Sequence, residues 1–191
     1  MLSQLIHRIK PSKKLDNILV ATTTNIEDDA IEKFCKEEGV GCFRGDSEDV
    51  LKRLNDAAVN EEATEIITLM GDNPLLHHDL VDAVIAEYEK TGKDYCTNYS
   101  KTVMLDGDME GWAKFPEGIG VQISSLEAIK RANRDAIDKY HRLHAMTYIF
   151  TQRNLFKSSI LLADGKWSAM NEPDLFLAVN TPQQFSNMEN I

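Results

Sequence analysis

One acidic residue, Asp72, stands where the sequence could support metal chemistry. It comes directly after an apolar run, residues 66–70, and Gly71, and Pro74 follows two positions later. A short run with β-branched members predicts a buried strand, and open α/β sheets bind ligands beyond the carboxyl ends of such strands. A carboxylate there can hold a hard cation such as Mg²⁺ together with phosphate oxygens. The alternative is that Asp72 only caps the following turn.

The elements that must position this turn alternate between helix and strand. Apolar spacing and turn residues predict the following order: a helix over 2–10, a strand over 17–22, a helix from 26 that Gly39 ends, a strand over 40–43, a helix capped by Asp46 and Ser47, the strand before Asp72, a helix from His78 to Gly92, and a strand over 94–98. Such alternation predicts a parallel sheet with helices on both faces, joined by right-handed crossovers.

The second half of the chain is less regular. Residues 99–120 contain four glycines and several acidic residues, and they predict an excursion over the sheet edge. Beyond it we expect a strand at 121–123, a capping box at 124–127, helical structure over 139–150, strands at 160–162 and 175–179, and a last helix capped by 181–184. We therefore predict one domain over residues 1–191.

Composition excludes several classes of protein. The chain has 191 residues and a net charge of −10, which argues against a nucleic-acid-binding or anionic-membrane-binding surface. No apolar run reaches the length of a membrane span, and the first residues lack a signal-peptide pattern. Three cysteines without CxxC spacing predict free thiols in a reducing cytoplasm.

Four segments give the chain a resemblance to a known family. Residues 20–31, 43–51, 69–75 and 178–183 are similar to segments of the cytidylyltransferases that activate acidic sugars as CMP conjugates. The branch named for spore-coat polysaccharide synthesis looks most alike. The resemblance implies a three-layer, Rossmann-like nucleotidyltransferase fold (the nucleotide-diphospho-sugar transferase fold) with a mostly parallel sheet. It also implies that a sugar hydroxyl attacks the α-phosphorus of CTP and that pyrophosphate leaves, with Mg²⁺ bridging phosphate oxygens.

The resemblance assigns roles to residues of this chain. Asp72 matches the metal-binding aspartate of the family, and Asn180 stands where the family has a second acidic residue before Thr-Pro. Gly71 and Asn73 flank Asp72 and are expected at the substrate site, whereas no catalytic residue is identified. Arg142 and His144 match part of an Arg-Glu-His pattern and could contact a carboxylate or phosphate. For this pair the alternative is an ordinary helix surface.

Three departures from the family pattern predict a feeble catalyst. The family begins with a strand and a glycine-rich basic loop that hold the triphosphate, whereas this sequence starts at the following helix. The sheet should therefore be incomplete at the N-terminus, lacking a first strand near its middle. Asn180 brings no charge to the metal site. Two acidic residues of the sugar site are missing, one within 116–120 and one at Leu143.

Two other functions remain open at this point. A non-catalytic relative or truncated remnant could act as an interaction module, and a nucleotide-sugar-dependent glycosyltransferase could use the Asp-x-Asp pattern at Asp106 and Asp108. The family resemblance further suggests a homodimer. We expect Trp112 and Phe115 of the excursion to contribute to its interface, because they are apolar groups in a polar segment.

Overall fold

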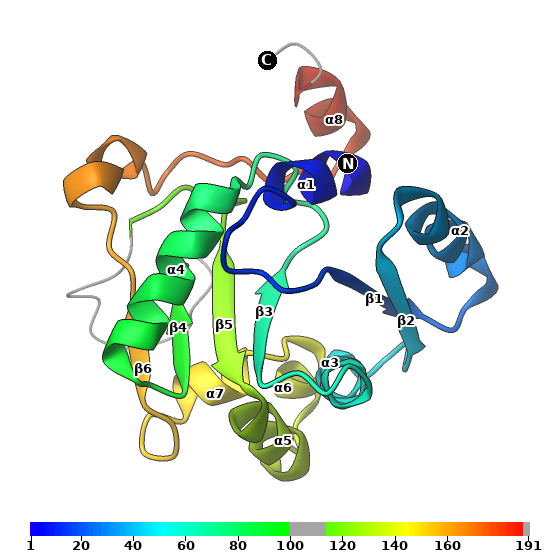
Figure 1. The fold of residues 1–191 in the computed structure, drawn as a ribbon, viewed down its shortest axis with the longest axis horizontal. Coiled ribbons are helices and arrows are strands. Elements are labelled where there is room, and N and C mark those ends of the chain that lie inside the picture. The colour runs from blue at the N-terminus through cyan, green and yellow to red at the C-terminus, as the bar shows by residue number, and fades with distance from the viewer. Residues whose placement is uncertain (100–113, 189–191) are drawn as a thin grey trace.

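The computed structural model describes residues 1–99 and 114–188 (Figure 1). The N-terminal half contains α1 (Leu2–Ile9), β1 (Leu19–Thr23), η1 (Ile26–Asp28), α2 (Asp29–Glu38), β2 (Gly41–Gly45), α3 (Val50–Asn60), β3 (Glu65–Leu69), α4 (His78–Thr91) and β4 (Tyr95–Thr97). The C-terminal half contains β5 (Val121–Ser125), α5 (Leu126–Asp135), α6 (Lys139–Leu143), α7 (Thr147–Thr151), β6 (Ser158–Ile160), η3 (Gly165–Met170) and α8 (Pro182–Met188). No helix within these described ranges is long and apolar enough to cross a bilayer.

Four strands form one sheet in the order β3-β5-β4-β6, while β1 and β2 form a separate parallel pair. Strand β6 pairs in parallel with β4, and β5 pairs antiparallel with both β3 and β4. Strands β3, β4 and β6 therefore point the same way, and β5 alone runs against them. The sheet is mostly parallel in direction, as predicted, with β5 as the exception.

The sheet is interrupted between β1 and β3. Among the described strands no ladder joins these two, so each has one edge without a strand partner. The side chains of β1 and β2 and the apolar ones of β3 are mostly half-buried, whereas every residue of β4 is buried. This interruption agrees with the prediction of an α/β sheet that lacks one strand near its middle.

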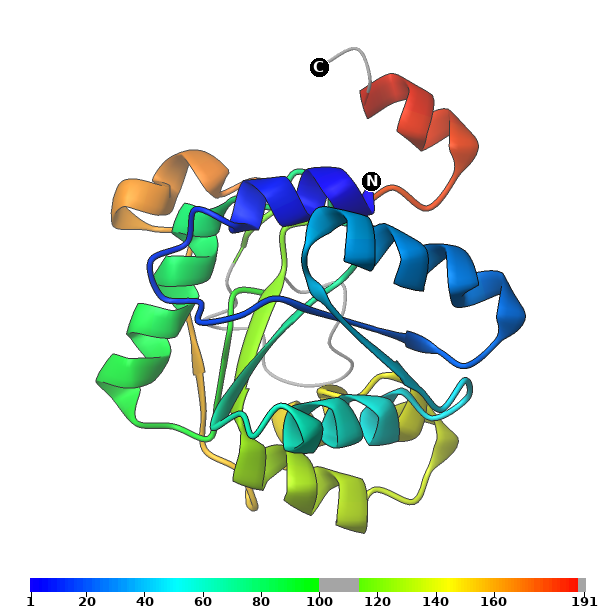
Figure 2. The ribbon, with the colours of Figure 1, turned by 45° about the vertical axis from the view of Figure 1, so that its right-hand side comes forward.

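Helices cover both faces of the four-stranded sheet and give three layers (Figure 2). Cys96 faces one apolar cluster, which is built with α1 and α4, and its neighbour Tyr95 faces the other cluster, built with α3, α5 and α7. This alternation is expected of a strand covered on both sides, because successive side chains point to opposite faces. The three-layer fold predicted from the family resemblance is thereby confirmed.

Most helix ends lie where the sequence predicts them. Gly39 and Gly92 adopt left-handed conformations and end α2 and α4. Two caps were misassigned: Asp49, and not Asp46 or Ser47, accepts the backbone N–H of Lys52 at the start of α3. Ser125, one residue later than expected, caps α5.

The C-terminal region differs from its prediction in several respects. The helical structure expected over 139–150 is divided into α6 and α7, the strand expected at 160–162 is β6 at Ser158–Ile160, and η3 was not predicted. Residues 175–179 are not a strand, because among the described residues they form an isolated parallel bridge, Glu117 to Phe176, and no ladder. The predicted capping box at the start of α8 is confirmed: Thr181 accepts the backbone N–H of Gln184, and the Gln184 side chain accepts the N–H of Asn180 at 2.8 Å. Residues 100–113, which include Asp106, Asp108 and Trp112, lie outside the described residues.

Candidate functional site

The carboxyl ends of β3 and β4 meet at one edge of the sheet, because the two strands point the same way. Asp72 lies in the turn after β3, and Tyr99 follows β4. The segment from Lys114 to Gly120, which leads into β5, also reaches this edge, because β5 runs in the opposite direction. Three segments that are distant in the sequence, the Asp72 turn among them, therefore meet at this edge.

A fourth segment brings Asn180 to the same place. The backbone N–H of Val179 donates to the backbone carbonyl of Asp72 at 2.9 Å. Because Asn180 is the next residue, the two predicted metal ligands lie in adjoining segments although 108 positions separate them. Val179 is buried and Asn180 is exposed, so the hydrogen bond between Val179 and Asp72 lies where the buried backbone gives way to the exposed residues of the site.

The carboxylate of Asp72 has an unsatisfied oxygen. Its Oδ1 atom is buried and has no hydrogen-bond partner among the described residues. A buried acceptor of this kind usually has a partner, and a carboxylate without one is suited to a cation. The oxygens of Asp72 and Asn180 are the hard donors that Mg²⁺ prefers. The donor set therefore fits a magnesium ion held by one carboxylate and one amide, with phosphate oxygens as further ligands.

Gly71 and Asn73 shape the turn that presents Asp72. Asn73 is only 3% exposed, its N–H donates to the Met70 carbonyl at 3.2 Å, and its own carbonyl accepts from Leu76 at 3.2 Å. These two bonds fold the backbone back on itself directly beyond β3. Gly71 is exposed, and a Cβ atom there would meet nothing within 4 Å. Asn73 thus stabilises the turn, while Gly71 leaves the approach to Asp72 open.

Tyr99 and Glu117 belong to this edge, although the sequence did not predict them as site residues. Burial, together with the nearby carboxylates of Asp72 and Glu117, raises the pKa of Tyr99 to about 12. Tyr99 therefore keeps its phenolic proton near neutral pH and can donate a hydrogen bond. One signal could have identified Tyr99, because it follows β4 as Asp72 follows β3.

Glycines let the segment before β5 approach the site closely. Gly118 has φ +98°, and a Cβ atom there would collide with the backbone nitrogen of Ala178. At Gly120 a Cβ atom would lie 2.5 Å from the ring of Tyr99. The backbone of Glu117 pairs with Leu175 and Leu177 through hydrogen bonds of 3.0 and 2.7 Å. Gly118 thereby permits the pairing that carries Asn180 towards Asp72.

Arg142 is engaged in structural contacts. Its guanidinium donates to both carboxylate oxygens of Asp49, at 3.0 and 2.9 Å from Nε, and to the carbonyl and side chain of Asn133 at 2.7 Å. These bonds link α6 to the start of α3 and to α5. His144 is exposed and its ring lies 4.6 Å from that of Tyr140. No hydrogen bond or ion pair among the described residues joins Arg142 or His144 to Asp72, so their substrate role stays a prediction.

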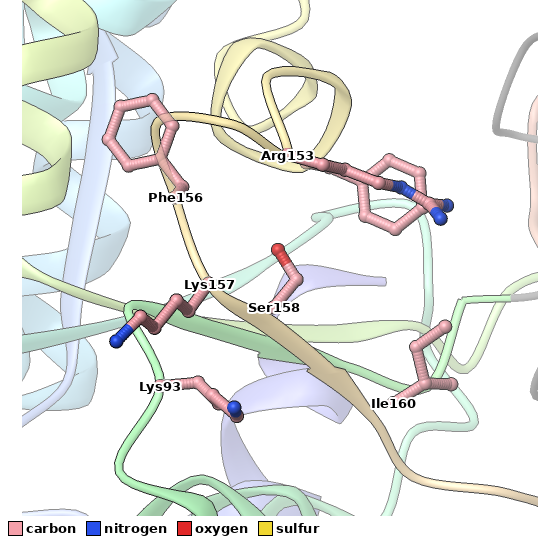
Figure 3. A pocket seen from close by; sticks show the side chains of 7 residues that line it. Lys93, Arg153, Phe156, Lys157, Ser158 and Ile160 are labelled. Atoms are coloured by element: carbon pink, nitrogen blue, oxygen red, sulfur yellow. The ribbon is translucent and has the colours of Figure 1, made fainter.

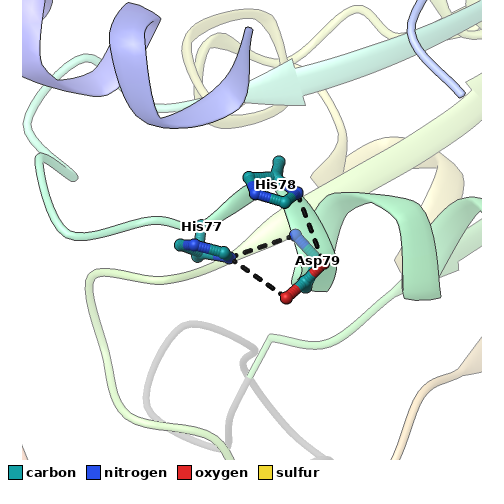
Figure 4. A group of neighbouring side chains, drawn as sticks. All are labelled: His77, His78 and Asp79. Carbon is teal, nitrogen blue, oxygen red and sulfur yellow. Dashed lines mark hydrogen bonds and ion pairs between the residues drawn. The ribbon is translucent and has the colours of Figure 1, made fainter. Parts of the chain in front are cut away.

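Three further metal-binding side chains stand at the start of α4. One ligand atom from each of His77, His78 and Asp79 lies within 4.8 Å of the others (Figure 4). However, the Nδ1 atom of His77 already accepts the backbone N–H of Asp79 at 3.3 Å and so caps α4. This contact explains the arrangement as a helix cap.

Comparison with known proteins identifies the family. The family model described as cytidylyltransferase matches residues 1–188. The chain belongs to the cytidylyltransferase family. It is 36% identical over 157 residues to an uncharacterized protein of Methanocaldococcus jannaschii, a match that covers 82% of this chain and 59% of that protein. The chain therefore spans less than two thirds of that relative's length.

Two further relatives agree with this assignment. The spore coat polysaccharide biosynthesis protein SpsF of Bacillus subtilis is 26% identical over 193 residues, covering 99% of this chain and 74% of SpsF. A solved structure of a cytidylyltransferase from Leptospira borgpetersenii superposes with a TM-score of 0.84 at 24% identity, covering 98% of this chain and 73% of that one. This structural likeness supports the fold described above.

Proposed function

We propose that this cytidylyltransferase transfers CMP from CTP to the hydroxyl group of an acidic sugar for surface polysaccharide synthesis. The observation that carries the proposal is the 2.9 Å hydrogen bond from Val179 to Asp72, which brings the two metal-binding segments together. The family membership supports the nucleotide, and the similarity to SpsF supports the polysaccharide. The acidic character of the sugar comes from the sequence resemblance alone.

The residues at the carboxyl ends of β3 and β4 would have different roles in this reaction. Asp72 and Asn180 would hold Mg²⁺, which when bound neutralises charge on the phosphates of CTP. Tyr99 keeps its proton and can donate a hydrogen bond to a phosphate or sugar oxygen. The turn around Asn73 fixes the direction of Asp72, so that its carboxylate needs little reorganisation when the substrates bind.

The test is pyrophosphate release from CTP with Mg²⁺ and a panel of acidic sugars. It should be run on the 191-residue chain and on the longest reading frame that contains it, each as wild type, Asp72→Asn and Asp16→Asn. Asp16 is an exposed carboxylate and serves as the matched control. We expect Asp72→Asn to lower the rate by about 10²–10³-fold in any active protein, as loss of a charge-stabilising group does. Sugar-independent rates, or an equal loss in the control, would contradict the proposal.

A dimer and cytoplasmic location also stay predictions. Phe115, which was expected at a subunit interface, is fully buried within the chain and packs edge-on against Trp167, with ring centroids 6.2 Å apart. That expectation was wrong for Phe115, because the residue fills the core between the sheet and η3. Light scattering at micromolar concentration would measure the mass directly.

A further inference from the structure

A cavity lies near the amino ends of β4 and β6, at the opposite end of the strands from the turn of Asp72. It has a volume of about 290 Å³ and is lined by Lys93, Phe150, Arg153, Phe156, Lys157, Ser158 and Ile160 (Figure 3). Lys93 precedes β4 and Lys157 precedes β6, and these two strands pair in parallel. Both lysines therefore lie at the amino ends of their strands, whereas Asp72 lies beyond the carboxyl end of β3.

The lining is basic in a protein whose net charge is −10. Lys93, Arg153 and Lys157 supply three cations, and no carboxylate lines the cavity. The nearest acidic residue in the sequence, Asp94, directs one carboxylate oxygen to the backbone N–H of Lys157 at 2.8 Å. Within the described ranges, no carboxylate oxygen forms an ion pair with any of the three cations. Such a cluster attracts an anion, because its charges are not neutralised within the protein.

The cavity also contains an unsatisfied hydroxyl group. The Oγ atom of Ser158 is buried and has no hydrogen-bond partner among the described residues. Ser158 and Ile160 share one face of β6, since side chains two apart in a strand point the same way. Ser159 points to the other face, where its hydroxyl contacts Thr91 at 3.0 Å. In Figure 3 the Ser158 hydroxyl is directed between Phe156 and Arg153, where it could donate to a ligand oxygen.

The remaining wall is apolar. Phe150 and Phe156 are each 3% exposed, and the guanidinium of Arg153 lies over the ring of Phe150 at 5.4 Å. This stacking restricts Arg153 before any ligand binds. Guanidinium and ammonium groups are the usual partners of phosphate, and flexible lysine stems let their charges follow the ligand. The volume is close to the lower end of ligand pockets, which suits a small molecule.

We propose that this cavity binds a small phosphate monoester. Its phosphate would lie beside Arg153 and accept a hydrogen bond from Ser158, and its organic part would pack on Phe156. The flexible stems of Lys93 and Lys157 would let their ammonium groups turn towards the phosphate. The site is separate from the Asp72 edge and does not depend on the proposed reaction. The phosphate monoester would act either as an effector of the enzyme or as part of a second substrate. The same residues would bind its phosphate in both cases.

The test uses phenyl phosphate and inorganic phosphate as probes in calorimetric titrations of the whole chain. The wild type should bind phenyl phosphate more tightly than inorganic phosphate, because only the ester has an apolar part to bury. Arg153→Gln and Lys157→Gln should each weaken phenyl phosphate binding about tenfold, and Ser158→Ala about fivefold, as expected for hydrogen bonds to a charged group.

Two variants serve as controls, with far-ultraviolet circular dichroism to verify that every variant is folded. Lys36→Gln removes an exposed cation on α2, and Asp72→Asn alters the other edge. Both should leave phenyl phosphate binding unchanged. The proposal is overturned by a wild type that binds neither probe, by equal affinity for the two probes, or by a Lys36→Gln effect as large as that of Lys157→Gln. A loss confined to Asp72→Asn, measured with Mg²⁺ present, would assign the phosphate to the other edge.

Discussion

The two ends of the four-stranded sheet, where its strands begin and where they finish, differ in charge although β4 contributes to both. At the carboxyl ends of β3 and β4, the carboxylates of Asp72 and Glu117 lie near Tyr99 and raise its pKa. At the amino ends of β4 and β6, Lys93 and Lys157 line a cavity without a carboxylate. We propose a cation site at the carboxyl ends of the strands and an anion site at their amino ends, and strand direction keeps the two apart. Three of the following predictions alter the carboxyl ends, and one alters a contact at neither end.

The largest effect is expected from Gly118→Ala at the carboxyl edge. An added Cβ atom collides with the backbone of Ala178, and φ +98° is strained for alanine. We expect a loss of about 3 kcal/mol in the free energy of unfolding, measured by urea denaturation. Gly71→Ala is the control, because open space surrounds that position. Similar free energies of unfolding for the two variants would show that the pairing of Glu117 with residues 175–177 contributes little to stability.

Arg142→Gln should have the next largest effect on the free energy of unfolding. Arg142 lies at neither the carboxyl nor the amino ends of the strands. It leaves the half-buried carboxylate of Asp49 without the guanidinium that lies 2.5–3.0 Å away, at a cost of about 2 kcal/mol. Arg134→Gln is the control, since Arg134 is exposed and pairs with its neighbour Asp135. Urea denaturation measures both variants. Unchanged stability together with weakened binding of an acidic sugar would instead support the substrate role predicted from the sequence.

Asn180→Asp should strengthen the cation site. A second carboxylate beside Asp72 adds charge without changing side-chain size, and we expect the Mn²⁺ affinity to rise about tenfold, or about 1.4 kcal/mol. Calorimetric titration measures the change, with Asn17→Asp as a control that adds the same charge at an exposed position. Phenyl phosphate binding at the opposite edge should not change. An equal rise in both variants would indicate net charge as the cause.

The smallest effect is a loss of folding stability at alkaline pH, where Tyr99 titrates. The pKa of Tyr99 is about 12 in the folded protein against an ordinary value of 10.0. The unfolded chain therefore releases this proton first, so the stabilising contribution is complete below pH 10 and is lost as pH rises towards 12. Denaturation curves of wild type and Tyr99→Phe across this range should show a steeper loss in the wild type. Parallel curves would contradict the assigned pKa.

Local sequence patterns predicted most of the elements and the turn of Asp72, because each depends on residues near one another in the chain. The run before Asp72, the ends of α2 and α4, and the capping box at Thr181 are of this kind. The family resemblance, and not the pattern, identified Asn180 as its companion. The failures involve long-range contacts: Glu117 pairs with Phe176, and Phe115 is fully buried in a core where Trp167 packs edge-on against it.

The same limit explains the cavity at the amino edge. Lys93, Arg153 and Lys157 carry no motif in the sequence, since their proximity depends on the parallel pairing of β4 with β6. Arg142 was a plausible anion ligand by residue type. Its partner Asp49 lies 93 positions away and could not be identified from local pattern.

Calorimetric titration with Mg²⁺ in the presence of CTP tests the central claim most directly, that Asp72 is the main ligand of a divalent cation at the carboxyl edge. The proteins to compare are wild type, Asp72→Asn and the control Asp16→Asn. Our account predicts that Asp72→Asn weakens Mg²⁺ binding at least about tenfold, because the buried Oδ1 atom then belongs to a neutral amide, while Asp16→Asn matches the wild type. Equal Mg²⁺ affinities in wild type and Asp72→Asn would contradict it.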